Sequence, residues 1–134
     1  MGTTTIEYRV LPGTRAAVGR SGNHHVIADR PEGKAGGMGL GFNGGELLAL
    51  AIGGCFCNDM QAIADRMAVT IADLKVSVDV DFGGEPSRAT DARLTVECTL
   101  ADGSDPSDLI ERTKAETTIG NSIRSGIPFE ISTA

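Results

Sequence analysis

The chain has 134 residues, enough for one domain with a sizeable core and too short for two independent domains. Apolar residues make up 40% of the sequence and charged residues 22%, as is usual for a soluble globular protein. The formal net charge of −6 argues against nucleic acid or an anionic membrane surface as a partner. We therefore expect a single domain over residues 1–134, with no nucleic-acid or membrane partner.

The N-terminal part of the sequence predicts three short antiparallel strands. Residues 3–10 alternate apolar and polar side chains with the period of a half-buried strand. Residues 16–20 and 24–29 predict two further strands, which are joined by a turn at residues 21–23. The glycine-rich residues 31–45 then predict a loop.

Residues 44–68 are the longest apolar stretch without turn signals, and they predict a long helix. Its first half is apolar almost all round, so we expect this helix to be buried. Cys55 and Asp59 lie on one face of it. Gly53 and Gly54 each cost about 1 kcal/mol relative to alanine in a helix, so we expect another element to pack closely against this point.

The C-terminal half predicts a hairpin, a second helix and a last strand. Residues 74–82 and 92–100 alternate apolar and polar side chains strictly, as two long paired strands do. Residues 105–125 predict a helix that ends at Gly126, and residues 128–132 predict a short edge strand. The order of elements along the chain places the fold in the α+β class.

The cysteines and histidines give no sign of a metal site or another cofactor. Cys55 and Cys57 are about 200° apart on the helix, so they form neither a C-x-x-C motif nor a joint metal site. Cys98 lies on the apolar face of a strand, where an inert buried thiol is the usual role. Periodicity alone favours the same role for Cys55. His24 and His25 point to opposite sides of a strand, so we interpret them as a solvent-facing pair.

The sequence favours a cytoplasmic protein with reduced thiols. Its N-terminus has neither the basic region nor the apolar core of a signal peptide. The longest apolar run, residues 47–57, is too short to span a membrane. No transmembrane segment is therefore expected.

Residues 41–56, GFNGGELLALAIGGCF, resemble the hallmark of the OsmC/Ohr family, in which an acidic opening leads through small residues to a cysteine. The downstream order of two strands, a helix and a short strand is also similar to that family. The resemblance implies an OsmC-like fold with N-terminal antiparallel strands and a long central buried helix. It further implies an intertwined homodimer with its active site at the dimer interface, in which Gly53 and Gly54 are the close-packing point for the other central helix.

In Ohr-like members a reactive cysteine attacks a hydroperoxide, and an arginine and a glutamate poise its thiolate. Cys55 matches this cysteine. Arg20 resembles the hairpin arginine, with Arg15 as its rival, and Glu46 stands one residue later than the Ohr-type acid. The resemblance therefore implies Cys55, Arg20 and Glu46 as catalytic residues. Thr117 occupies the place of the family's second cysteine, so this helix cannot supply a disulfide partner.

Two functions follow, and the sequence leaves both open. The first is a thiol-dependent peroxidase-type protein that reduces organic hydroperoxides through Cys55, with an external thiol as reductant or with weakened activity. The second is a non-catalytic OsmC-like dimer that binds an apolar small molecule or acts as a scaffold. The expected partners are a second copy of the chain, a small apolar hydroperoxide or ligand and, for the active form, the external thiol.

Overall fold

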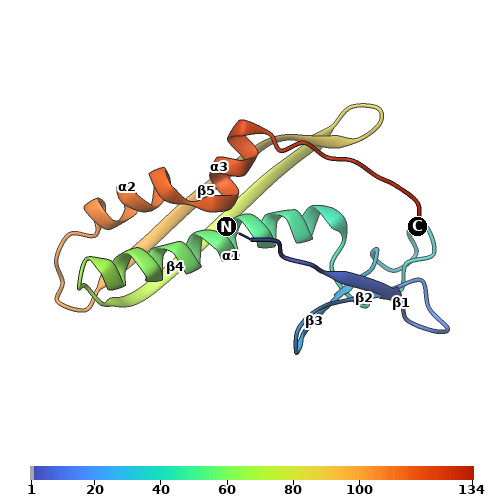
Figure 1. Cartoon of the computed structure of the whole chain (residues 1–134), viewed down its shortest axis with the longest axis horizontal. Coiled ribbons are helices and arrows are strands. Elements are labelled where there is room, and N and C mark those ends of the chain that lie inside the picture. The colour runs from blue at the N-terminus through green and yellow to red at the C-terminus, as the bar shows by residue number, and fades with distance from the viewer. Residues whose placement is uncertain (1) are drawn as a thin grey trace. The chain divides into compact units, whose positions relative to one another are not determined.

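The structure, a computed structural model, describes residues 2–134 and contains three helices and five strands. Their order confirms the α+β class (Figure 1). The elements are β1 (Glu7–Val10), β2 (Ala17–Ser21), β3 (His24–Ala28), α1 (Gly44–Arg66), β4 (Ile71–Gly83), β5 (Arg88–Leu100), α2 (Ser107–Glu116) and α3 (Thr118–Ser125). The chain divides after Leu48 into two compact units, called here the first and the second unit.

The first unit holds an antiparallel sheet with the strand order β1-β2-β3. Arg20 is paired in register with Glu7 on one side and with His25 on the other. His24 and His25 are both exposed, which confirms that they form a solvent-facing pair. The three strands predicted from alternation are therefore present, with slightly different ends.

Asp29 organises the glycine-rich loop that follows β3. Its side chain is 8% exposed and accepts hydrogen bonds from the amides of Arg30 at 2.8 Å, Met38 at 3.1 Å and Leu40 at 2.9 Å. These amides, that of Leu40 most strongly, lower the pKa of Asp29. The carboxylate therefore accepts hydrogen bonds from three loop amides and holds the loop in place.

Helix α1 begins with a capping box. The Asn43 side chain accepts a hydrogen bond from the Glu46 amide at 2.9 Å, and the Glu46 carboxylate accepts one from the Asn43 amide at 3.0 Å. The two side chains thereby satisfy backbone donors that have no partner at the start of a helix. The helix then continues into the second unit, where one side of it is buried.

By length and composition alone, α1 could cross a membrane, and it is the one such helix in residues 2–134. The sequence predicted no such segment, because its longest purely apolar run is shorter than this helix. A core helix of a soluble protein passes the same test. Five side chains of α1 are buried within the structure: Ile52, Phe56, Met60, Ile63 and Ala64.

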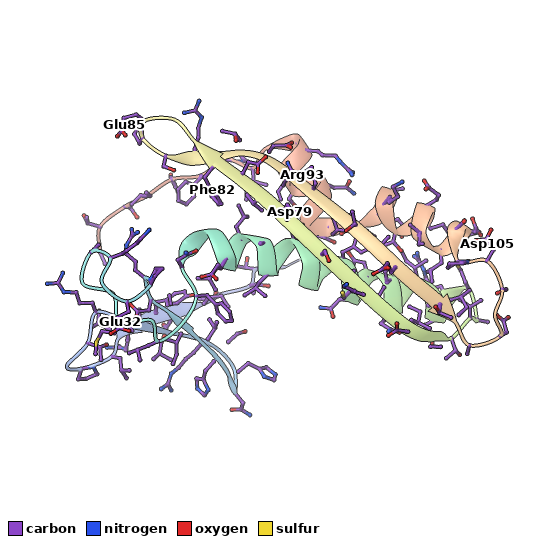
Figure 2. The ribbon with its side chains drawn as sticks, turned by 180° about the vertical axis from the view of Figure 1, so that it is seen from behind. Glu32, Asp79, Phe82, Glu85, Arg93 and Asp105 are labelled. Carbon is purple, nitrogen blue, oxygen red and sulfur yellow. The ribbon has the colours of Figure 1, made fainter. Side chains whose placement is uncertain are left out.

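The second unit is built on the hairpin of β4 and β5, whose alternation was predicted. Val76 and Val96 are register partners on its apolar face. This face packs on a core that joins Met60 of α1 to Leu109 of α2, so both helices lie on the same side of the hairpin (Figure 1). The opposite face is polar, and it carries the cross-strand partners Asp79 and Arg93 that Figure 2 labels.

The close crossing predicted at the two mid-helix glycines exists at one of them. A Cβ atom on Gly53 would lie 3.1 Å from Cγ2 of Val78 in β4, so the bare backbone lets strand and helix approach. Gly54 has no such neighbour within 4 Å in the described chain. The crossing element is therefore a strand of the same unit.

Two details of the C-terminal region differ from the prediction. The helix expected over residues 105–125 is interrupted at Thr117, whose ψ of 120° is not helical. The edge strand expected over residues 128–132 is not formed among the described residues. A strand exists only through pairing with a neighbour, and this segment is instead exposed, with Phe129 at 84% and Ile131 at 85%.

Candidate functional site

Cys55 lies half-buried on α1 and has one polar partner. Its Sγ donates a hydrogen bond to Oδ2 of Asp59, one helical turn later, at 3.5 Å. The same carboxylate oxygen accepts a hydrogen bond from the Thr118 amide at 3.1 Å. Asp59 thus connects the cysteine to the beginning of α3. This confirms that Cys55 and Asp59 share a helix face.

Thr117 stands at the junction of α2 and α3, directly before the residue that Asp59 holds. Its amide donates to the carbonyl of Thr113 at 2.9 Å, which ends α2. Its side chain is nearly covered, with the residue 6% exposed. A Cβ atom on Gly120 would lie 2.7 Å from the Thr117 methyl group, so this junction needs glycine at position 120. Thr117, which the resemblance places where the family has its second cysteine, therefore directly precedes Thr118, whose amide binds Asp59.

An apolar pocket of about 350 Å³ adjoins this junction. It lies within the second unit and is lined by α1, β5, α2 and α3, together with Thr117. Cys55 is not among the lining residues, whereas Ile52 and Phe56 of the same helix are. The thiol therefore lies outside the pocket lining. Thr117 borders the pocket, and the next residue, Thr118, binds the Asp59 carboxylate that accepts the hydrogen bond from Cys55.

The other two predicted site residues, Arg20 and Glu46, belong to the first unit. Arg20 is exposed on β2, and no ion pair joins it to a carboxylate of residues 2–48. The rival Arg15 lies against Gly36, where a Cβ atom would come within 2.5 Å of its Cδ. Glu46 has the capping role described above. Cys55 belongs to the second unit, where its polar partner is Asp59, which also binds the Thr118 amide.

Cys98 has surroundings of a different kind. It lies on β5 opposite Leu74 and packs against the apolar core. Burial and, to a lesser degree, the charge of Asp73 raise the pKa of its thiol. A thiol that keeps its proton is a poor nucleophile, so the inert role predicted for Cys98 is supported.

Asp59 is the part of this site that the sequence prediction did not recognise. The helical spacing placed it on the face of Cys55, and that four-residue interval was the available signal. Its second partner, the Thr118 amide, comes from a segment 59 residues away, which no local pattern reveals. Within residues 2–134 no group of three or more His, Cys, Asp and Glu side chains could hold a metal ion.

A family profile described as OsmC-like protein matches residues 36–132, which include α1, both long strands and both later helices. The chain belongs to the OsmC-like family. This confirms the family indicated by the motif that leads to Cys55. A search of curated protein sequences finds no match.

Solved OsmC-like structures share the fold over almost the whole chain. An OsmC-like protein from Mycoplasma pneumoniae superimposes with a TM-score of 0.76 at 16% identity, covering 93% of this chain and 89% of its own. An organic hydroperoxide resistance protein from Legionella pneumophila gives 0.63 at 16%, covering 92% and 90%. Another, from Elizabethkingia anophelis, gives 0.68 at 18%, covering 94% and 91%. At these identities the likeness establishes the fold.

Proposed function

We propose that this OsmC-like protein reduces small organic hydroperoxides through Cys55, with an external thiol as reductant. The observation that carries the proposal is the hydrogen bond from Cys55 to Asp59, which gives the thiol proton an acceptor. Two solved structures with the same fold are named organic hydroperoxide resistance proteins. Together they favour peroxide chemistry at this cysteine.

The reaction starts with transfer of the thiol proton from Cys55 to Asp59, because the thiolate is the nucleophile. The sulfur attacks the terminal peroxide oxygen, the O–O bond breaks, and its electron pair leaves with the other oxygen as an alkoxide. The proton on Asp59 then converts the alkoxide into the alcohol. Cys55 is left as a sulfenic acid.

An external thiol has to complete the cycle, because Thr117 offers no sulfur. One thiol condenses with the sulfenic acid, releasing water and forming a mixed disulfide with Cys55. A second thiol displaces Cys55 and leaves with the first as a disulfide. The cycle therefore consumes two thiols for each hydroperoxide. We propose the cytoplasm, where thiols are kept reduced, as the compartment.

A homodimer is part of the proposal, because Arg20 and Glu46 would act with Cys55 in it. Exposed apolar side chains near both ends of the chain support a second copy as the partner. They include Val10 at 67% exposure in β1 and Ile127 at 70% beyond α3. In the dimer we assign to Arg20 the stabilisation of the thiolate, and to Glu46 the orientation of that arginine.

Purified protein incubated with cumene hydroperoxide and a dithiol tests the proposal. We expect peroxide consumption that Cys55→Ser abolishes and that Cys57→Ser and Cys98→Ser preserve, because only Cys55 has the hydrogen-bonded acceptor. Turnover that survives Cys55→Ser would contradict the proposal. The oligomeric state of each variant, measured by light scattering, separates loss of chemistry from loss of assembly.

A second candidate function is the binding of an apolar small molecule without catalysis. The apolar pocket beside Thr117 favours it, since the volume of about 350 Å³ falls within the range of small-molecule sites. Binding of such a molecule with the same affinity before and after Cys55→Ser, together with no peroxide turnover, would favour this function over the first.

A further inference from the structure

The pocket beside Thr117 combines an apolar interior with positive charge at its edge. Its interior is formed by side chains from α1, β5, α2 and α3: Ile52, Phe56, Leu94, Val96, Ile110 and Ile123. Three basic residues, Arg93, Lys114 and Arg124, also line the pocket, and no acidic residue belongs to the lining. A ligand of this pocket therefore meets mainly hydrocarbon, and every charged side chain in the lining is basic.

The three basic residues differ in how far their charges are already neutralised. The guanidinium of Arg93 is bound by Asp81, at 2.8 and 3.2 Å, and also by Asp91 (Figure 2 labels Arg93). These partners lie on the polar face of the hairpin, opposite the face that lines the pocket. Arg93 therefore contributes little charge to the pocket.

The ammonium group of Lys114 is paired with Glu111 at 3.0 Å on the surface of α2. Arg124 at the end of α3 has only neutral partners, namely Oδ1 of Asn121 at 3.0 Å and the carbonyl of Lys114 at 3.4 Å. No carboxylate of residues 49–134 lies within 4.0 Å of its guanidinium. Arg124 is thus the cation whose charge remains available to a ligand.

The hydroxyl group of Thr117 supplies a second polar contact that is not used within the protein. It makes no hydrogen bond in the part of the chain that the structure describes, although the residue is only 6% exposed. No fully buried side-chain oxygen lacks a partner in residues 2–134, so this oxygen retains access to solvent, and the pocket is the space that Thr117 borders. A hydroxyl held in this way is available to a ligand oxygen.

We propose that this pocket binds a small amphipathic carboxylate, with its hydrocarbon part on the apolar lining and its carboxylate on Arg124. The planar guanidinium can donate two parallel hydrogen bonds to a carboxylate, and Thr117 can donate a third. The interior contributes affinity in proportion to the apolar surface that it removes from water. The proposal does not depend on the reactivity of Cys55, which lies outside the lining.

Three eight-carbon probes, octanoate, 1-octanol and octylamine, test this assignment in isothermal titration calorimetry with the full chain. They share the hydrocarbon chain and differ in the charge of the head group. We expect octanoate to bind about tenfold or more tightly than octanol, because hydrogen bonds to charged groups add this much affinity. Octylamine is expected to bind more weakly than octanol, since its ammonium group would meet Arg124.

Substitutions in the pocket test whether the carboxylate of octanoate binds at Arg124 and Thr117. Arg124→Met should weaken octanoate binding about tenfold and leave octanol binding unchanged, whereas Arg88→Met, an arginine outside the pocket, should change neither. Thr117→Val keeps the shape of the side chain and should weaken octanoate binding severalfold, which provides a second test if Arg124→Met does not fold. Cys55→Ser should bind octanoate like the wild type even where peroxide turnover is lost.

Three results would overturn the proposal. One is binding of octanoate no tighter than that of octanol. Another is wild-type affinity for octanoate in both Arg124→Met and Thr117→Val. The third is absence of octanoate binding altogether. None of these results bears on peroxide consumption by Cys55, so the failure of this proposal can be distinguished from the failure of the proposed function.

Discussion

The regions around Cys55 and Cys98 give two half-buried cysteines different polar surroundings. Each has an aspartate near it. Asp59 accepts a hydrogen bond from Cys55 and holds the Thr118 amide as well, whereas Asp73 acts on Cys98 through its charge alone. The comparison separates two effects: Cys55 has a directed acceptor for its proton, whereas burial, together with the charge of Asp73, keeps the proton on Cys98.

The largest expected effect concerns the two aspartates. Asp59→Asn keeps an oxygen for the Thr118 amide but cannot take the thiol proton, so we expect peroxide turnover to fall about 100-fold. The matched control Asp73→Asn should leave turnover unchanged. Steady-state consumption of cumene hydroperoxide measures both. Equal rates of peroxide consumption in Asp59→Asn and Asp73→Asn would contradict the role of Asp59 as the proton acceptor.

The next effect is on stability. Cys98→Ser places a hydroxyl group against the apolar core and should lower the free energy of unfolding by about 1–3 kcal/mol. Cys55→Ser should cost less than about 1 kcal/mol, because the serine hydroxyl can donate to Asp59 in place of the thiol. Urea unfolding of the two variants checks this order, and a larger loss for Cys55→Ser would contradict it.

A smaller effect concerns the pH at which Cys98 reacts. Because its pKa is raised, its alkylation by iodoacetamide should require a higher pH than that of an ordinary thiol. Asp73→Asn should move this pH profile downward in part, since the larger contribution, burial, remains. Mass spectrometry of labelled protein, in a background with Cys55 and Cys57 replaced by serine, follows Cys98 alone. An unchanged profile would show that Asp73 does not act on this thiol.

The smallest expected effect is on the pH dependence of stability. It concerns Asp29, a carboxylate that, unlike Asp59, accepts hydrogen bonds from backbone amides alone. The pKa of Asp29 is lowered in the folded chain, so its contribution to stability is present above the pKa of the unfolded chain. This contribution is lost as the pH falls through the folded value. Asp29→Asn should therefore be less stable than the wild type near neutral pH, and the difference should shrink as the pH falls below the ordinary pKa of an aspartate. A difference that grows in acid would contradict this role.

The sequence predicted elements whose signals are local. Strict alternation identified β4 and β5, and a long stretch without proline identified α1. The break at Thr117 carries no glycine or proline signal, so the second helix was predicted as continuous. The segment at residues 128–132 has the composition of a strand but no partner among the described residues, and pairing is a property that composition does not supply.

The candidate site was predicted in part for a similar reason. The family motif indicated Cys55, and helical spacing placed Asp59 on its face. The contact between Asp59 and Thr118 joins distant segments. The pocket in which Arg124 lies requires four elements to come together. Such arrangements depend on tertiary packing, which a single sequence does not display.

The most direct measurement is the identification of the cysteine that peroxide oxidises. Wild-type protein is treated with one equivalent of cumene hydroperoxide in the presence of a dimedone-type probe, which traps sulfenic acid, and is then mapped by mass spectrometry. We predict that the probe is found on Cys55 and not on Cys98. Labelling of Cys98 to the same extent, or no labelling of Cys55, would contradict the assignment of Cys55 as the reacting thiol.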